Sequence, residues 1–148
     1  MILHPQLNKD CSILGKMQLS LALLLNDSRY PWIILVPQQP NLCELIDLER
    51  PQQLQLLDES NQVQQVLLEL YHPEKLNVGA LGNLVPQLHL HHIARFTDDP
   101  AWPAPVWGHS PATPYDDDQL ERRSRELIEA LSITKVSTNE AVCLLTPH

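Results

Sequence analysis

A long helical pattern between two prolines is the feature that most constrains how this sequence can fold. Apolar side chains recur at helical spacing along one face of the segment 50–71: Leu56, Val63, Leu67 and Leu70. Glutamines and carboxylates occupy the other face. Pro51 suits a first helical turn, and Pro73 ends the pattern because proline lacks the backbone N–H that a helix interior needs. The sequence therefore predicts one main helix over 50–71.

Strand-like segments flank this helix on both sides. The apolar runs 19–25 and 32–36 surround an Asn-Asp-Ser turn, which predicts a β-hairpin that Pro37 ends. After the helix, 75–80 and 85–96 are predicted as two further strands joined by a Leu-Gly-Asn turn. We expect an α+β fold, in which an antiparallel sheet of about five strands packs against the main helix.

The segments outside these elements are less regular. A short turn of helix is expected at 42–48. Residues 98–114 contain five prolines, so no regular element is expected there. Aspartates at 116–118 predict the start of a second helix over 116–131, because carboxylates suit the positive end of the helix dipole. Its apolar stripe consists of Leu120, Leu127, Ile128 and Leu131. The tail from residue 133 is compatible with either a loop or a final strand.

Composition excludes several classes of function. The chain has 148 residues and a net charge of −8, with no basic block that would follow a phosphate backbone. The longest apolar run, 19–25, is too short to cross a bilayer, and the N-terminus has no signal-peptide pattern. Cys11, Cys43 and Cys143 lack metal-ligand spacing and are expected to be buried thiols in a reduced compartment. We predict a cytoplasmic protein of one domain, 1–148, without nucleic-acid or membrane partners.

Two histidines share one face of the last predicted strand. Because side chains alternate along a strand, Gln87, His89 and His91 are expected on one face and His92 on the other. Imidazole can act as a nucleophile or carry a proton near neutral pH. From the residues alone, His89 and His91 have three alternative roles: a catalytic pair, a hydrogen-bonded structural pair, or two ligands of a metal ion. No nearby carboxylate or cysteine completes a metal-binding set, so we expect no metal.

The segment 87–93, Gln-Leu-His-Leu-His-His-Ile, resembles the histidine-triad motif His-φ-His-φ-His-φ-φ, where φ is apolar. Upstream, Asn77-x-Gly and Gly82 are similar to the glycine-containing loop that precedes this motif in the histidine-triad (HIT) family. The order of hairpin, helix, strand, glycine turn and histidine strand also matches the HIT-like fold. The resemblance covers a core of about 15–107 and leaves a C-terminal helical extension of about 115–148.

The resemblance implies a reaction. Members of the family are nucleotide hydrolases and transferases that act at the α-phosphate, where the middle histidine attacks phosphorus and carries a transient nucleotidyl group. The resemblance assigns this attack to His89, and it assigns a supporting hydrogen bond near the phosphate to His91. Asn77, Gly82 and Asn83 match positions around the phosphate or substrate.

The implied substrates are small nucleotides, such as dinucleoside polyphosphates or nucleoside phosphoramidates. The resemblance also implies a homodimer in which long helices and sheet edges pair about a two-fold axis. It implies no cofactor, although a divalent cation is compatible with a polyphosphate substrate.

Two positions depart from the family pattern. Gln87 stands where the first histidine usually stands, and its amide can bind near the phosphate but cannot shuttle a proton. Leu84 stands where many relatives carry a serine or threonine near the leaving group, and it cannot donate a hydrogen bond. These departures motivate an alternative function, a nucleotide-binding protein with little or no turnover.

Residues outside the motif give weaker indications. Relatives bind the ribose with residues near the hairpin, so Asn26 and Asp27 are ribose candidates, although both also suit a turn. Trp102 and Trp107 are expected to be packing residues, with a wall of the nucleotide site as the alternative.

Overall fold

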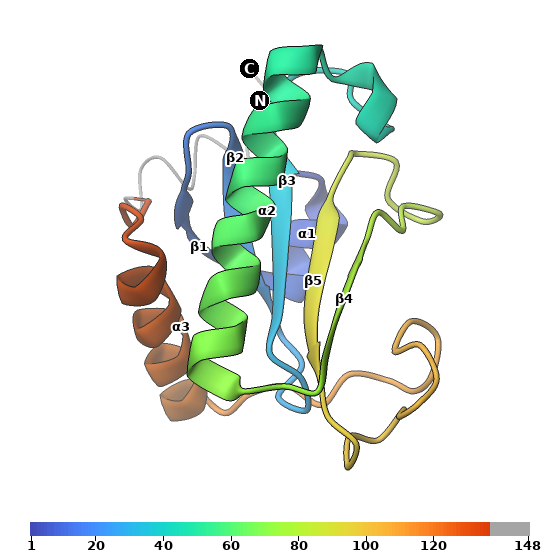
Figure 1. The fold of residues 1–148 in the computed structure, drawn as a ribbon, viewed down its shortest axis with the longest axis vertical. Coiled ribbons are helices and arrows are strands. Elements are labelled where there is room, and N and C mark those ends of the chain that lie inside the picture. The colour runs from blue at the N-terminus through green and yellow to red at the C-terminus, as the bar shows by residue number, and fades with distance from the viewer. Residues whose placement is uncertain (137–148) are drawn as a thin grey trace.

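Antiparallel strands form a five-stranded sheet in the computed structural model, which describes residues 1–136 (Figure 1). Their order across the sheet is β1-β2-β3-β5-β4. The strands are β1 (Cys11–Lys16), β2 (Ser20–Leu25), β3 (Trp32–Pro37), β4 (Lys75–Gly79) and β5 (Leu90–Arg95). The helices are α1 (Pro5–Asp10), the short 3-10 helix Leu45–Asp47, α2 (Arg50–Tyr71) and α3 (Asp117–Leu131). The predicted α+β fold is therefore confirmed.

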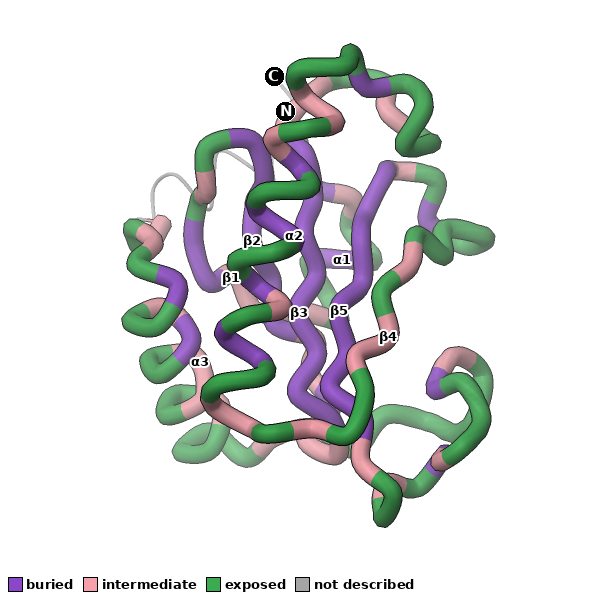
Figure 2. The backbone as a smooth tube through the Cα atoms, viewed as in Figure 1, coloured by how far each residue is buried: buried purple, intermediate pink, exposed green. Residues whose placement is uncertain are grey.

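The two faces of the sheet pack against different segments of the chain. Side chains such as Leu24 and Ile33 are buried on one face against α2 and α3, whereas their neighbours Ile34 and Ile93 are buried on the opposite face. That second face is covered by the N-terminal segment and by part of the segment 98–115. In Figure 1, α2 crosses in front of the sheet and α1 lies behind it. Figure 2 shows burial concentrated on the central strands, whereas the residues of the outer strand β4 are exposed or of intermediate burial.

Helix α2 spans the predicted residues, and its ends have local causes. Glu49 and Gln52 form a capping box, in which each side chain accepts a hydrogen bond from the other's backbone N–H. His72 ends the helix in the left-handed conformation, with φ of 47°. The predicted apolar face includes the buried side chains Leu56, Val63 and Leu67 and the partly buried Leu70. Within residues 1–136, no helix is long and apolar enough to span a membrane.

The second helix and the irregular segment before it also agree with the sequence prediction. The carboxylate of Asp116 accepts the backbone N–H of Gln119 at 2.8 Å and caps α3. Leu127 and Leu131 are buried against α2 and the sheet. Residues 98–114 form turns and bends without a helix or strand.

The predicted strand 85–96 is wrong in its first half, because β5 begins only after His89. Pro86 has no backbone N–H to give to a neighbouring strand. The N–H of Leu88 donates instead to the carbonyl of Leu42, at 2.9 Å, in the loop before α2. His89 therefore lies at the entry of β5 rather than inside the strand.

The sequence analysis predicted neither α1 nor β1 individually. The pairing of β1 is irregular between Ile13 and Gly15, which obscures a simple alternation in the sequence. A Cβ at Gly15 would overlap the carbonyl of Thr134, so this close approach requires glycine. Thr134 forms an isolated bridge to β1. The remaining tail, 137–148, with Cys143, lies outside the described residues.

Candidate functional site

His89 lies at the entry of β5 with one ring nitrogen held by the backbone. Its Nδ1 lies 2.7 Å from the carbonyl oxygen of Gln87. Because a carbonyl can only accept, Nδ1 carries the proton of the neutral ring, and Nε2 keeps its lone pair. The side chain is only 5% exposed, but it borders a cavity. The local backbone thus favours the tautomer of the neutral imidazole in which Nε2 carries no proton.

His91, two residues further along, is held in the opposite tautomer. The indole N–H of Trp32 on β3 donates to Nδ1 of His91 at 2.9 Å. The proton of the neutral ring therefore lies on Nε2, 3.4 Å from the carbonyl of Leu81. Burial lowers the pKa of His91 to about 4, and the nearby His89 adds to this shift. In their neutral forms, His91 offers an N–H and His89 offers a lone pair, each on Nε2.

The two imidazoles lie within an aromatic cluster. Their ring centroids are 4.9 Å apart. His91 also packs edge-on against Trp32, at 5.6 Å, and against Trp107, at 5.5 Å. Trp107, which the sequence left between packing and a site wall, thus lies directly beside the histidines. Trp102 lies instead against the guanidinium of Arg95, 5.7 Å from its ring centroid.

Trp32 is a site residue that the sequence analysis missed, since it was only part of the apolar run 32–36. Trp32 pairs with Ile93 across β3 and β5, which places its indole near His91. The register of two strands so distant in sequence cannot be read from one chain. The available signal was the indole N–H itself, because a buried tryptophan usually needs a hydrogen-bond acceptor.

A cavity of about 170 Å³ lies beside His89. Its lining residues are Cys43, Glu44, Ala80, Gly82, Asn83, Pro86, Gln87, Leu88 and His89. A Cβ at Gly82 would lie 2.9 Å from the carbonyl oxygen of Val85 and 3.7 Å from Cε1 of His89. Glycine therefore lets this turn fold closely onto the backbone of Val85, beside the imidazole of His89. The structure brings four predicted site residues together here: Gln87, His89, Gly82 and Asn83.

The expectation of buried cysteines is wrong for Cys43. Its side chain is exposed, because it lies in the loop between β3 and α2 rather than inside an element. It is also a lining residue of the His89 cavity that sequence reasoning missed, together with Glu44. Cys11 is half-buried, and burial raises the pKa of its thiol to about 12.

The side chain of Gln87 holds the N-terminal segment. Its Oε1 accepts the backbone N–H of His4 at 2.8 Å, and its Nε2 donates to the carbonyl of Ile2 at 3.0 Å. Both ends of the amide are therefore engaged by the backbone of residues 2–4. Gln87 borders the cavity, but it holds His89 through its backbone carbonyl rather than through its side chain.

Asn77 lies further from the histidines than the sequence suggested. In the ladder between β4 and β5, Asn77 pairs with Ile93, whereas Gly79 pairs with His91. The Oδ1 of Asn77 accepts from Nη1 of Arg95 at 2.7 Å. Its amide thus belongs to a network around a buried arginine, outside the lining of the His89 cavity.

The side chains of Asn26 and Asp27, the ribose candidates, accept backbone N–H groups from the segment before α3. Asn26 accepts the backbone N–H of Tyr115 at 2.9 Å, and Asp27 forms a salt bridge with Arg29 at 2.9 Å. They lie in the turn before β3, at the end of that strand away from His89. The structure does not bring them to the cavity beside His89.

His92 faces α2, away from the other two histidines, as the alternation predicts. Its Nε2 lies 2.8 Å from Oγ of Ser60, and its Nδ1 lies 3.3 Å from the carbonyl of Ile33. Burial lowers the pKa of His92 to about 4. His92 thus links β5 to α2. Across the described part of the chain, no group of three or more His, Cys, Asp or Glu side chains is arranged to hold a metal ion.

The fold and site together define a class of small α+β proteins with a histidine pair beside a glycine turn, at the entry of a buried strand. The sequence profile of the HIT domain matches residues 6–98, more than half of the chain. The protein belongs to the HIT domain family.

Solved structures agree with this assignment. A histidine triad protein from Marinobacter aquaeolei is 45% identical, with a TM-score of 0.86, over 88% of this chain and 95% of that one. A histidine triad protein from Bradyrhizobium japonicum is 43% identical, with a TM-score of 0.85, over 87% and 96%. A third, from Sinorhizobium meliloti, is 40% identical, with a TM-score of 0.84, over 86% and 95%. Comparison with curated proteins finds no match.

Proposed function

We propose that this protein is a nucleotide phosphohydrolase or nucleotidyl transferase that acts at an α-phosphate through a covalent intermediate on His89. One observation carries the proposal: the carbonyl of Gln87 holds the His89 proton on Nδ1, so Nε2 has a free lone pair beside a cavity. A neutral imidazole of this kind is a competent nucleophile. Membership of the HIT domain family supports the proposal, because nucleotide hydrolases and transferases are typical of that family.

The proposed reaction has two displacements. Nε2 of His89 attacks the α-phosphorus, and a P–N bond forms as the bond to the leaving group breaks. The leaving group takes the electron pair and acquires its proton from solvent. Water then attacks the same phosphorus, the P–N bond breaks with its electrons returning to Nε2, and the proton of the water passes to solvent. A different acceptor in place of water gives transfer, and the two steps divide one high barrier.

His91 would act as a neutral hydrogen-bond donor. Its Nε2–H makes only a long contact with the carbonyl of Leu81, 3.4 Å away, and a phosphoryl oxygen would be a stronger acceptor. With a pKa of about 4, His91 has no extra proton to give at neutral pH. We therefore favour leaving groups that need little protonation, such as the phosphate side of a dinucleoside polyphosphate, over phosphoramidates.

The proposed phosphate contacts come from the glycine turn. Backbone N–H groups at Gly82 and Asn83 would bind phosphate oxygens beside His89. With Gln87 in place of the first motif histidine, position 87 would serve catalysis through its carbonyl, a role that any side chain permits. Asn77 could reach substrate only by leaving Arg95, so we assign it a supporting contact at most.

Trapping the intermediate tests this function. We expect incubation with a dinucleoside polyphosphate, followed by mass spectrometry, to reveal a nucleotidyl group on the peptide that contains His89. His89→Ala should abolish the adduct and lower turnover by at least about a thousandfold. His109→Ala is the matched control, because His109 is exposed, its ring lies 3.0 Å from the hydroxyl of Ser110, and it does not line the His89 cavity. An adduct that persists in His89→Ala would assign the attack to another residue.

The second candidate is a nucleotide-binding protein with little or no turnover. Two observations favour it: Leu84 offers no hydroxyl and is 93% exposed, and His91 is neutral. Calorimetry with the same nucleotides separates the two functions. Saturable binding with neither adduct nor product would support the binding protein and exclude the enzyme.

We also propose a homodimer that forms through α2 and the outer strand β4. Large apolar side chains are exposed on and around these elements: Leu45, Ile46, Leu54, Leu57, Val78 and Leu81. Several of them border an open cavity of about 590 Å³ between α2 and β4. Such a patch is typical of an interface. Sedimentation of the protein should give a dimer, and Leu57→Glu with Val78→Glu should give a monomer.

A further inference from the structure

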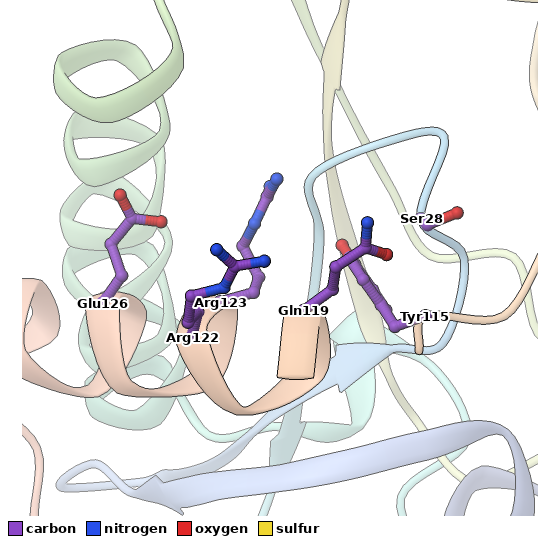
Figure 3. Close-up of a pocket in the computed structure, with 6 residues that line it drawn as sticks. All are labelled: Ser28, Tyr115, Gln119, Arg122, Arg123 and Glu126. Atoms are coloured by element: carbon purple, nitrogen blue, oxygen red, sulfur yellow. The ribbon is translucent and has the colours of Figure 1, made fainter. Parts of the chain in front are cut away.

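A second cavity lies between α3 and the turn before β3, and shares no lining residue with the His89 cavity. Its volume is about 470 Å³. The lining residues are Ser28, Tyr115, Gln119, Arg122, Arg123 and Glu126 (Figure 3). Figure 3 shows the side chains of Gln119, Arg122, Arg123 and Glu126 projecting from α3 to the same side, with Tyr115 beside them.

Two arginines give the lining of this cavity a positive charge, although the chain as a whole is acidic. Arg122 and Arg123 both line the cavity, and neither forms an ion pair with any residue of the described chain. The only carboxylate in the lining, Glu126, already accepts the hydroxyl of Tyr71 at 2.8 Å. The protein as a whole carries a net charge of −8. The cavity is therefore a local positive site on a negative molecule.

Two buried polar atoms of residues that line this cavity have no hydrogen-bond partner within residues 1–136. They are Nη1 of Arg123 and the hydroxyl oxygen of Tyr115. Buried polar atoms without partners are uncommon in folded proteins and call for an explanation such as an absent ion. Burial raises the pKa of Tyr115, so its hydroxyl keeps its proton and can donate. Both atoms are therefore donors without an acceptor.

The donors are held in place by their neighbours. The guanidinium of Arg123 lies over the ring of Tyr71, 4.5 Å from its centroid, and over that of Tyr115, at 5.8 Å. The backbone of Tyr115 is fixed by Asn26, and the N–H of Ser28 donates to the carbonyl of Thr113 at 2.7 Å. Binding would therefore need little further ordering of Arg123 and Tyr115.

We propose that this cavity binds the phosphate group of a small phosphorylated molecule, with Arg122, Arg123, Gln119 and Tyr115 as donors. A phosphate accepts several hydrogen bonds in different directions, which matches donors from α3 and from the segment before it. The cavity is within the size range of small-molecule sites, so it has room for more than the phosphate itself. The inference does not depend on the chemistry proposed for His89.

Calorimetry and NMR titrations at constant ionic strength test this site, with inorganic phosphate, AMP and acetate as probes. We expect saturable binding of phosphate and AMP, with acetate weaker by about tenfold or more. Arg122→Gln and Arg123→Gln should each weaken phosphate binding by about tenfold. Arg125→Gln is the matched control, because Arg125 lies on the same helix and pairs with Glu121 outside the cavity.

The outcomes are distinct. Acetate that binds as tightly as phosphate would overturn the phosphate assignment. Equal weakening by Arg125→Gln would show nonspecific attraction and overturn the site. Arg122 is exposed, so Arg122→Gln gives a clear result even where Arg123→Gln unfolds the protein. Phosphate binding that is lost in His89→Ala would place the ligand at the other cavity, whereas retained binding would support the inference independently of catalysis.

Discussion

The indole nitrogen of Trp32 and Nδ1 of His91 lie 2.9 Å apart, and their hydrogen bond joins β3 to β5 beside the candidate nucleophile. Because the indole nitrogen can only donate, this bond fixes the proton of His91 on Nε2. Both side chains are buried, so little water competes for the bond. The tautomer of one site histidine thus depends on a residue that is distant in sequence.

Trp32→Phe should release this constraint. The variant keeps an aromatic ring but leaves Nδ1 of His91 buried without a donor, which should lower the free energy of unfolding by about 1–3 kcal/mol. We also expect a second tautomer of His91, visible in the ¹⁵N shifts of its ring. If His91 donates to the phosphate as proposed, turnover should fall as this tautomer appears.

Tyr30→Phe provides the control for this prediction. The ring centroids of Tyr30 and Trp32 lie 6.3 Å apart, and the buried hydroxyl of Tyr30 has no hydrogen-bond partner in the described part of the chain. Removing that hydroxyl should leave stability and the His91 tautomer unchanged. Equal losses in Trp32→Phe and Tyr30→Phe would show that ring packing, rather than the hydrogen bond, determines the state of His91.

Stability should fall in mild acid because two histidines are buried in the neutral form. The pKa values of His91 and His92 are about 4 in the folded protein, against 6.5 for an ordinary histidine. Between these values the unfolded chain binds more protons, so the free energy of unfolding decreases as pH falls from about 6.5 to about 4. Each histidine contributes at most about 3 kcal/mol to this loss. Urea unfolding across this pH range measures it.

A variant without His92 checks the origin of that slope. His92→Gln should reduce the pH dependence of unfolding between about 6.5 and about 4 by roughly half, whatever its effect on absolute stability. The carboxylates of Asp27 and Asp99 have lowered pKa values. Their contribution to the free energy of unfolding is therefore lost only at more acidic pH, outside the range in which the histidines titrate. An unchanged slope in His92→Gln would rule out His92 as one of the titrating groups.

The parts of the fold that the sequence predicted well depend on local causes. The bounds of α2 follow from apolar spacing and from residues next to its ends, such as Glu49. The start of β5 depends instead on Leu88, whose N–H bonds to Leu42 in a distant loop. The irregular β1 is shaped by the close approach of Gly15 to Thr134. Neither contact leaves a periodic signal in the sequence.

The same distinction holds for the candidate site. His89 and Gln87 are two residues apart in one motif, so the sequence locates both, although the hydrogen bond between the Gln87 carbonyl and the His89 ring was not predicted. The bond from Trp32 to His91 and the engagement of Asn77 by Arg95 depend on strand register. Register between separated strands is a property of the folded sheet, and a single sequence does not reveal it.

Gln87→Leu should separate the two roles of this position. The side chain holds the backbone of His4 and Ile2, whereas the carbonyl holds His89. We expect faster hydrogen exchange in the N-terminal segment and a loss of stability of about 1–2 kcal/mol. Adduct formation at His89 should persist. An abolished adduct in a folded Gln87→Leu protein would show that the amide side chain itself takes part in the reaction.

Gln87→His places an imidazole at the position that resembles the first motif histidine, and it complements that test. An imidazole keeps one donor or acceptor for the N-terminal backbone, so we expect the protein to fold and to keep or raise its turnover. Circular dichroism and the steady-state rate measure both properties. Loss of folding would show that the two-ended amide bond to residues 2–4 is a structural requirement.

Gly82→Ala should disturb the turn that faces His89. The new Cβ would lie 2.9 Å from the carbonyl oxygen of Val85, so the turn must move, at a cost of about 1–3 kcal/mol in stability. This turn borders the same cavity as His89, so its displacement should slow adduct formation. Gly79→Ala is the control, because its Cβ would meet only the Trp107 ring at an ordinary 3.6 Å. The measurements are the free energy of unfolding and the rate of adduct formation for both variants. Equal losses in Gly82→Ala and Gly79→Ala would show that the close approach of Gly82 to Val85 is not required by the site.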